Sequence, residues 1–156
     1  MIVKSIRIVA FGTALALAGP AVWAMDTGGS DRPKETSADY ERGVKAVRAG
    51  NYSSALPLLQ KVVARNAKDA DAWNFIGYSQ RKLKRYDDAL TAYQKALAIK
   101  PDHRGANEYI GELYLETGQL SKAKERLKVL DSACFFGCEE YDELKAAIAA
   151  YEAKKK

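Results

Sequence analysis

A spacing of 34 residues repeats three times along this chain. It places Gly43, Gly77 and Gly111 in one column and Ala55, Ala89 and Ala123 in another. A repeat of this length is one helix–turn–helix unit, which cannot bury its apolar face alone and must stack on its neighbours. The spacing therefore predicts an all-α stack of hairpins, which offers an extended binding surface rather than an enclosed active site.

The second half of each of the first two repeats has the apolar period of an amphipathic helix. One stripe contains Ala55, Leu56, Leu59, Val62 and Val63, and the other contains Ala89, Leu90, Tyr93, Ala96 and Leu97. We expect turns at Gly50-Asn51, Lys84-Arg85 and Gly118-Gln119, and amino-terminal caps at Ser53, Asp87 and Ser121.

The segment 70–103 has the most regular pattern of the three. Its characteristic positions are Trp73, Ile76, Gly77, Tyr86, Ala89, Tyr93, Ala96 and Pro101. This pattern resembles the tetratricopeptide repeat (TPR). Segments 36–69 and 104–137 keep the register with fewer matches, because Asp39 replaces the Trp of the first and Phe135 the closing Pro of the third. The resemblance implies a right-handed superhelix of three hairpins whose concave side is lined by the first helix of each.

A seventh helix is expected over 139–154, where Tyr141, Leu144, Ile148 and Tyr151 form a single apolar stripe. Its remaining surface is polar, as the last helix of a stack requires. This helix should close the superhelix. The tail from Leu130 to Tyr151 also resembles the endings of some exported bacterial TPR proteins.

The first 24 residues read as a cleaved signal peptide. Lys4 and Arg7 precede an apolar run over 8–18, and Val22 and Ala24 suit a cleavage site. The run is too short for a membrane-spanning helix, so we expect no stable membrane anchor and a periplasmic or secreted protein that starts at Met25. Residues 25–35 are rich in Gly, Ser, Asp and Pro and read as a flexible leader.

The charge balance argues against a nucleic-acid partner. The formal net charge of the whole chain is +5, and loss of Lys4 and Arg7 with the signal lowers it to +3. Three of the positive charges are the terminal lysines at 154–156, which suit the carboxyl end of a helix. Such a weak excess predicts no electrostatic binding of phosphates.

The candidate binding residues lie on the first helices, where the resemblance implies a concave groove. They are Tyr40, Arg48, Asn74, Tyr78, Arg81, Lys82, Glu108, Glu112 and Glu116. The three glutamates recur every four residues, so either Arg81 and Lys82 face them or a cationic ligand does. A solvated charged surface and a groove for a basic or extended peptide are both consistent with this pattern.

Chaperone-type TPR domains clamp a peptide carboxylate with Lys, Asn and Arg at defined columns. Those columns hold Tyr40, Val44, Phe75, Gly105 and Tyr109 here. This departure argues against recognition of an acidic carboxyl terminus by that clamp.

Cys134 and Cys138 flank Phe135-Phe136-Gly137, between the third repeat and the closing helix. In an exported protein, two cysteines this close favour a disulfide that pins the closing helix. Redox catalysis remains an alternative, although a two-residue spacer is usual there. A metal or haem site lacks ligands, because the one histidine, His103, lies in another loop.

We find no phosphate loop, nucleophile elbow or paired-carboxylate motif, and we expect neither an enzyme nor a bound cofactor. The sequence instead predicts an exported adaptor or scaffold that binds a protein or peptide on its concave side. The alternative is a structural protein of the cell envelope that self-associates through repeat one.

Overall fold

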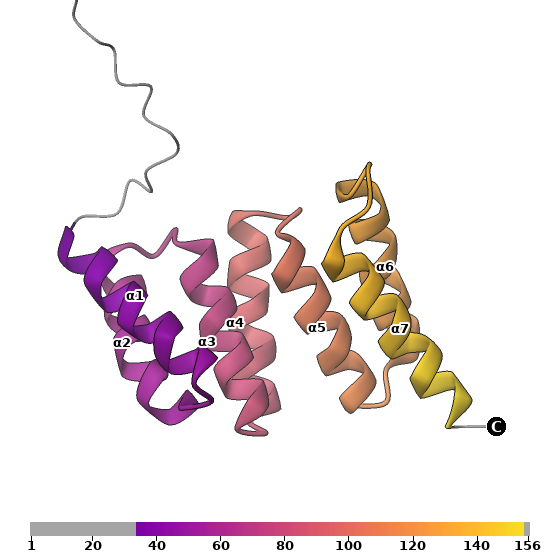
Figure 1. The fold of residues 1–156 in the computed structure, drawn as a ribbon, viewed down its shortest axis with the longest axis horizontal. Coiled ribbons are helices and arrows are strands. Elements are labelled where there is room, and N and C mark those ends of the chain that lie inside the picture. The colour runs from indigo at the N-terminus through magenta and orange to yellow at the C-terminus, as the bar shows by residue number, and fades with distance from the viewer. Residues whose placement is uncertain (1–33, 155–156) are drawn as a thin grey trace, which may run out of the picture. The chain divides into compact units, whose positions relative to one another are not determined.

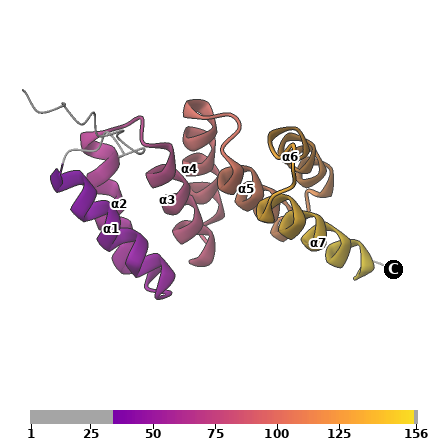
Figure 2. The same cartoon turned by 45° about the horizontal axis from the view of Figure 1, so that its top comes forward.

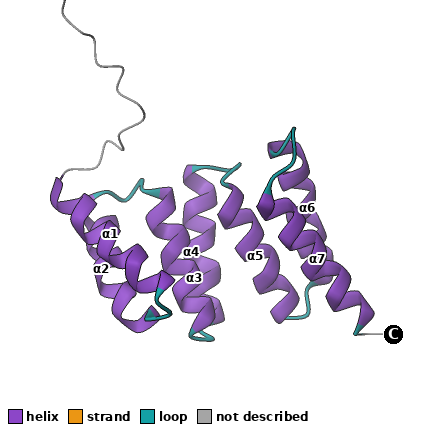
Figure 3. Cartoon of the chain, viewed as in Figure 1, coloured by secondary structure: helices purple, strands orange, loops and turns teal. Residues whose placement is uncertain are grey.

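The computed structural model describes residues 34–154, so the expected signal peptide and most of the expected leader lie outside the described residues. This range contains seven α-helices and no strand (Figure 1 and Figure 3). The helices are α1 Lys34–Arg48, α2 Tyr52–Arg65, α3 Ala70–Lys82, α4 Tyr86–Ile99, α5 Arg104–Glu116, α6 Leu120–Ala133 and α7 Glu139–Ala153. None of these helices is long and apolar enough to cross a lipid bilayer.

The helices pair as the repeat register predicts: α1 packs on α2, α3 on α4 and α5 on α6. Successive hairpins join through α2 with α3 and through α4 with α5. Within residues 34–154, α1 contacts α3 and α3 contacts α5, whereas the second helices α2, α4 and α6 do not contact one another. Neighbours come closest on the inner side of a curved stack, so the first helices line the concave side.

The turn inside each hairpin requires a left-handed backbone residue. Gly50 and Gly118 have φ angles of +74° and +78°, which cost glycine little. Repeat two has Lys84 at the same place, with a φ of +61°. A residue with a Cβ is strained in this conformation, so the turn of the most regular repeat carries a local cost.

The expected capping residues are wrong. Ser53, Asp87 and Ser121 lie inside the first turns of their helices, and the cap positions are Asn51, Arg85 and Gln119, none of which makes a side-chain capping bond. The left-handed turn leads the chain directly into each second helix. Each of these helices therefore begins before the polar residue that we expected to cap it.

The glycine column marks close packing, but its third member has a different partner. A Cβ on Gly43 would lie 2.8 Å from the side chain of Leu59, and one on Gly77 would lie 2.6 Å from the ring of Tyr93. At Gly111 the nearest atom, also at 2.6 Å, belongs to Leu144 of α7.

Helix α7 therefore does not simply continue the stack as a fourth first helix. It contacts α5 more than α6, whereas α3 and α5, in their contacts with the preceding hairpin, pack more on its second helix than on its first. Both views show α7 alongside α5 (Figure 1 and Figure 2). Helix α7 thus covers part of the concave side of repeat three.

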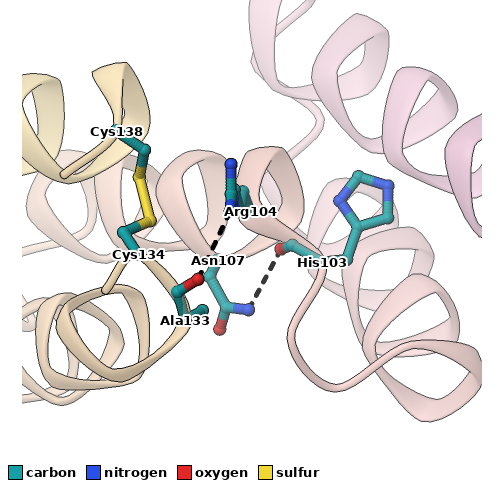
Figure 4. Close-up of a disulfide and its surroundings, with 6 residues drawn as sticks. All are labelled: His103, Arg104, Asn107, Ala133, Cys134 and Cys138. Carbon is teal, nitrogen blue, oxygen red and sulfur yellow. Dashed lines mark hydrogen bonds between the residues drawn. A yellow bond between two sulfur atoms is a disulfide. The ribbon is translucent and has the colours of Figure 1, made fainter. Parts of the chain in front are cut away.

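The predicted disulfide is present where α6 gives way to α7. The Sγ atoms of Cys134 and Cys138 are 2.03 Å apart (Figure 4). Beside this bridge, Arg104 at the start of α5 donates a hydrogen bond to the carbonyl oxygen of Ala133 at 3.4 Å. The bridge ties the start of α7 to the end of α6, while Leu144 and Ile148 of α7 are buried in the terminal core.

Candidate functional site in the concave seam between α3 and α5

Helices α3 and α5 meet along three contacts, each about one helical turn from the next, which we call the α3–α5 seam. Asn74 lies beside Gly105, where an added Cβ would be 3.1 Å from the amide nitrogen of Asn74. The rings of Tyr78 and Tyr109 have their centroids 4.8 Å apart. Arg81 forms an ion pair with Glu112. The three pairs share an offset of 31 residues, so they follow from one helix-to-helix register.

Arg81 is the central charge of the seam. Only 3% of this residue is exposed. Its Nη1 donates to Oε1 of Glu116 at 2.6 Å, and its Nη2 pairs with Oε2 of Glu112. Burial opposes the charged form, but Tyr93, Glu112 and Glu116 outweigh burial and raise the pKa of Arg81. Arg81 is therefore a fixed cation that links hairpins two and three.

Aromatic rings extend the seam toward repeat one. The guanidinium carbon of Arg81 lies 5.5 Å from the ring centroid of Tyr78, and the ammonium of Lys82 lies 5.0 Å from the same centroid. Tyr52 of α2 packs edge-to-face with Tyr78, with 6.0 Å between ring centroids. These rings form an apolar surface beside the buried guanidinium of Arg81, and their faces can also bind cations.

A cavity of about 270 Å³ opens where the seam meets α7. Its lining residues are Arg81, Glu112, Leu115, Glu116, Ala147, Ala150, Tyr151 and Lys154. The side chains of Glu112 and Glu116 are 28% and 37% exposed, so their carboxylates reach solvent although they hold a buried arginine. The cavity therefore combines an apolar wall from α5 and α7 with an acidic edge.

Glu108 lies outside this cavity. It is 3% exposed, and its carboxyl group shares a hydrogen bond with Glu143 of α7. Burial and the neighbouring Glu143 raise the pKa of Glu108 from 4.5 to about 9. At neutral pH this side chain is a buried neutral acid between two helices, and it offers no negative charge to a ligand.

The structure separates the predicted site residues into three groups. Tyr78, Arg81, Lys82, Glu112 and Glu116 meet at the seam, and buried Asn74 lies at its far end. Tyr40 instead packs edge-to-face on Phe75 between α1 and α3, and Arg48 is exposed at the end of α1. Each step of four residues turns the helix by about 40°. Glu108 therefore points toward α7 while Glu116 points toward α3. The three glutamates at 108, 112 and 116 do not share one face of the helix.

Sequence reasoning missed several residues of the cavity and seam. Tyr109 could have been found, because it follows Tyr78 by the same 31 residues that separate Arg81 from Glu112. Ala147 and Ala150 gave no such signal, since alanine on a helix carries no chemical preference. Within residues 34–154, no three His, Cys, Asp or Glu side chains are grouped as a metal site would require.

Two models of the tetratricopeptide repeat match the chain, one over residues 40–104 and the other over residues 80–148. Together they cover most of the chain. The protein belongs to the tetratricopeptide repeat family. Its seven helices and its structural neighbours establish the TPR superhelical fold.

Among curated proteins, tetratricopeptide repeat protein 37 of Xenopus laevis is 33% identical over 86 residues, which are 55% of this chain and 6% of that protein. The first two curated relatives are much longer, because the chain spans 15% and 6% of their lengths. These similarities therefore concern a shared repeat rather than a shared whole protein.

Among solved structures, PcrH in complex with the chaperone binding region of PopD has a TM-score of 0.68 and 19% identity, over 77% of this chain and 92% of PcrH. The Yersinia enterocolitica secretion chaperone SycD, with a peptide of the translocator YopD, has a TM-score of 0.67 and 17% identity. That match covers 81% of this chain and all of SycD. At these identities the likeness shows the fold.

Proposed function

We propose that this protein is an exported, non-catalytic TPR adaptor that binds an extended peptide segment in the concave seam between α3, α5 and α7. The observation that carries this proposal is the open cavity beside Arg81, which joins an apolar wall to two carboxylates. The TPR fold supplies a scaffold for peptides, as in PcrH and SycD, which are solved with segments of PopD and YopD.

The ligand chemistry follows from the groups around the cavity. Arg81 engages Oε2 of Glu112 and Oε1 of Glu116, so the second oxygen of each carboxylate is not used by this ion pair. Two carboxylates and one guanidinium give this cluster one net negative charge. Lys154 brings the formal charge of the lining to zero, but it is exposed at the end of α7, so solvent screens its charge more strongly than that of the seam. A peptide with a Lys, an Arg or a free amino group next to an apolar residue fits best.

A selection experiment tests this specificity. The purified protein is used to select binders from a random peptide library displayed on phage. We expect the enriched sequences to combine an apolar residue with Lys or Arg, and their affinity to fall as salt is raised, because the carboxylates are partly exposed. Failure to enrich any sequence, or enrichment of acidic sequences, would contradict the proposal.

Export is supported by the basic and apolar segments of the first 24 residues and by the disulfide, which suits an oxidising compartment. Expression of the full-length gene in a bacterial host, followed by mass measurement of the purified protein, tests this part separately. We expect a chain that begins at Met25 in the periplasmic fraction. An intact precursor in the cytoplasm would argue against export while leaving peptide binding open.

A further inference from the structure

The described residues have three exposed large hydrophobic side chains, and all three lie near the loops between successive hairpins, along one edge of the stack. Phe135 and Phe136 are 87% and 97% exposed in the loop between α6 and α7, and Ile99, at the end of α4, is 37% exposed. Figure 1 shows the α4–α5 loop and the α6–α7 loop at the same edge of the ribbon. The bond from Arg104 to the carbonyl oxygen of Ala133 joins these two regions directly. Concentrated apolar exposure of this kind marks an interaction site.

The two phenylalanines, which we call the Phe finger, are held in a defined arrangement. Their rings pack edge-to-face, with centroids 5.0 Å apart and planes at 87°. The disulfide between Cys134 and Cys138 closes the loop around them, and Gly137 has a φ of +85° that allows the tight turn. A closed loop loses little conformational freedom when it binds, so the finger is prepared for insertion into a pocket.

A groove that could receive such a finger lies beside it. This end groove has a volume of about 560 Å³ and is lined by Pro101, Asp102, Lys128, Val129, Ser132 and Ala133. Its apolar lining comes from Pro101 of the α4–α5 loop and from Val129 and Ala133 of α6. The finger of the same chain does not fill the groove, because both phenylalanine side chains are exposed.

We propose that two copies of this chain form a two-fold symmetric dimer in which the Phe finger of each copy inserts into the end groove of the other. The finger and the groove lie along the same edge of one molecule, and Ala133, which lines the groove, directly precedes Cys134. Two complementary features placed this close on one surface can be exchanged reciprocally about a two-fold axis.

The area available matches what a stable dimer needs. One phenylalanine buries about 150–250 Å², so the four in a dimer would bury about 600–1,000 Å². The partner surfaces that they cover would lose about the same area, which gives about 1,200–2,000 Å² in total. This is the range of specific protein–protein interfaces. The face of repeat one, which the sequence suggested for self-association, has no exposed large hydrophobic residue among those that the structure describes.

Charges favour a second copy over a lipid surface. Glu139 and Glu140 follow the finger after Gly137 and Cys138. The groove is lined by the exposed Lys128 and by Asp102, and Lys100 lies next to Pro101. In the proposed dimer the acidic start of α7 in one copy approaches these lysines of the other copy. The same glutamates would be repelled by the negative surface of an anionic membrane.

Sedimentation of the purified protein, obtained by expressing the full-length gene and kept oxidised, tests the dimer. We expect a reversible monomer–dimer equilibrium for the wild type. F135S/F136S removes the finger at exposed positions, and V129E places a charge in the groove; each should weaken the dimer at least about tenfold. A149E, on the exposed surface of α7, is the matched control and should dimerise like the wild type, with circular dichroism to check that all variants fold.

Mixing the two defective variants gives the sharpest result. F135S/F136S keeps its groove and V129E keeps its finger, so the mixed dimer retains one of the two finger–groove contacts and should form more readily than the dimer of either variant alone. A wild type that is monomeric at all concentrations, undiminished dimerisation of F135S/F136S, or a mixture that associates no more than either variant alone would overturn the proposal. Flotation of a monomeric wild type with phosphatidylcholine vesicles, lost in F135S/F136S, would overturn it in favour of a lipid partner. Peptide binding in the concave seam is independent of all these outcomes.

Discussion

Arg81 on α3 donates a hydrogen bond to Glu116 on α5 at 2.6 Å, across a separation of 35 residues, and almost none of the arginine is exposed. This bond, with the second ion pair to Glu112, joins two hairpins that otherwise meet mainly through α4 and α5. The same residue supports the stack and lines the candidate binding cavity.

Replacing Arg81 with Lys should destabilise the fold by about 1–3 kcal/mol, because a single ammonium cannot engage both carboxylates as the planar guanidinium does. The check is urea-induced unfolding followed by circular dichroism. Arg85→Lys, at an exposed position just past the end of α3, is the control and should change the free energy of unfolding by less than about 0.5 kcal/mol. Equal unfolding midpoints for Arg81→Lys and the wild type would show that engaging both carboxylates through one guanidinium adds no stability.

Glu108→Gln should reduce the pH dependence of stability. The pKa of Glu108 is raised from 4.5 to about 9 in the folded protein, so the folded state holds this proton more tightly than the unfolded chain. Its contribution to stability is complete below about pH 4.5 and is lost as the pH rises toward about 9, by up to about 1.4 kcal/mol per pH unit. Glutamine mimics the protonated acid at every pH.

The measurement is the free energy of unfolding of both proteins at several pH values within this window. We expect the difference in stability to grow in favour of Glu108→Gln as the pH rises. Glu125→Gln, at an exposed site on α6, controls for the loss of a surface charge. Parallel pH profiles for wild type and Glu108→Gln would mean that Glu108 is ionised in the fold.

Lys84→Gly should stabilise the protein by about 0.5–1 kcal/mol. Lys84 has a φ of +61°, where a Cβ is strained, and the gain is reduced by the greater freedom of glycine in the unfolded chain. Gly50→Ala makes the reverse change at the equivalent turn, where nothing lies within 4 Å of the added Cβ, so it should destabilise through the backbone alone. Thermal unfolding of both variants measures the change in stability. A lower midpoint for Lys84→Gly than for the wild type would show that the backbone at Lys84 is not strained.

The 34-residue register was sufficient to predict the hairpins, because glycine and alanine columns report close packing between helices that are neighbours in sequence. The pairing of Gly43 with Leu59 and of Gly77 with Tyr93 repeats at the same offset. The disulfide was predictable for the same reason, since Cys134 and Cys138 are separated by only four residues.

The position of α7 was not predictable, because it depends on tertiary packing that no local pattern records. Leu144 occupies the notch at Gly111, and the resulting approach of α7 buries Glu108. The spacing of four residues made the three glutamates of α5 look equivalent. In the structure Glu108 contacts α7, whereas Glu112 and Glu116 contact α3. Reversing all three to Lys would therefore disrupt the fold as well as any groove, and is a poor test of binding.

The most direct test of peptide binding fills the cavity without touching its ion pairs. Ala150 lines the cavity and is exposed on α7, whereas its exposed neighbour Ala149 does not line it. Fluorescence anisotropy of a peptide selected on the wild type should show affinity at least about tenfold weaker for Ala150→Trp and unchanged for Ala149→Trp. Equal affinity of both variants for that peptide would contradict binding in the α3–α5–α7 seam.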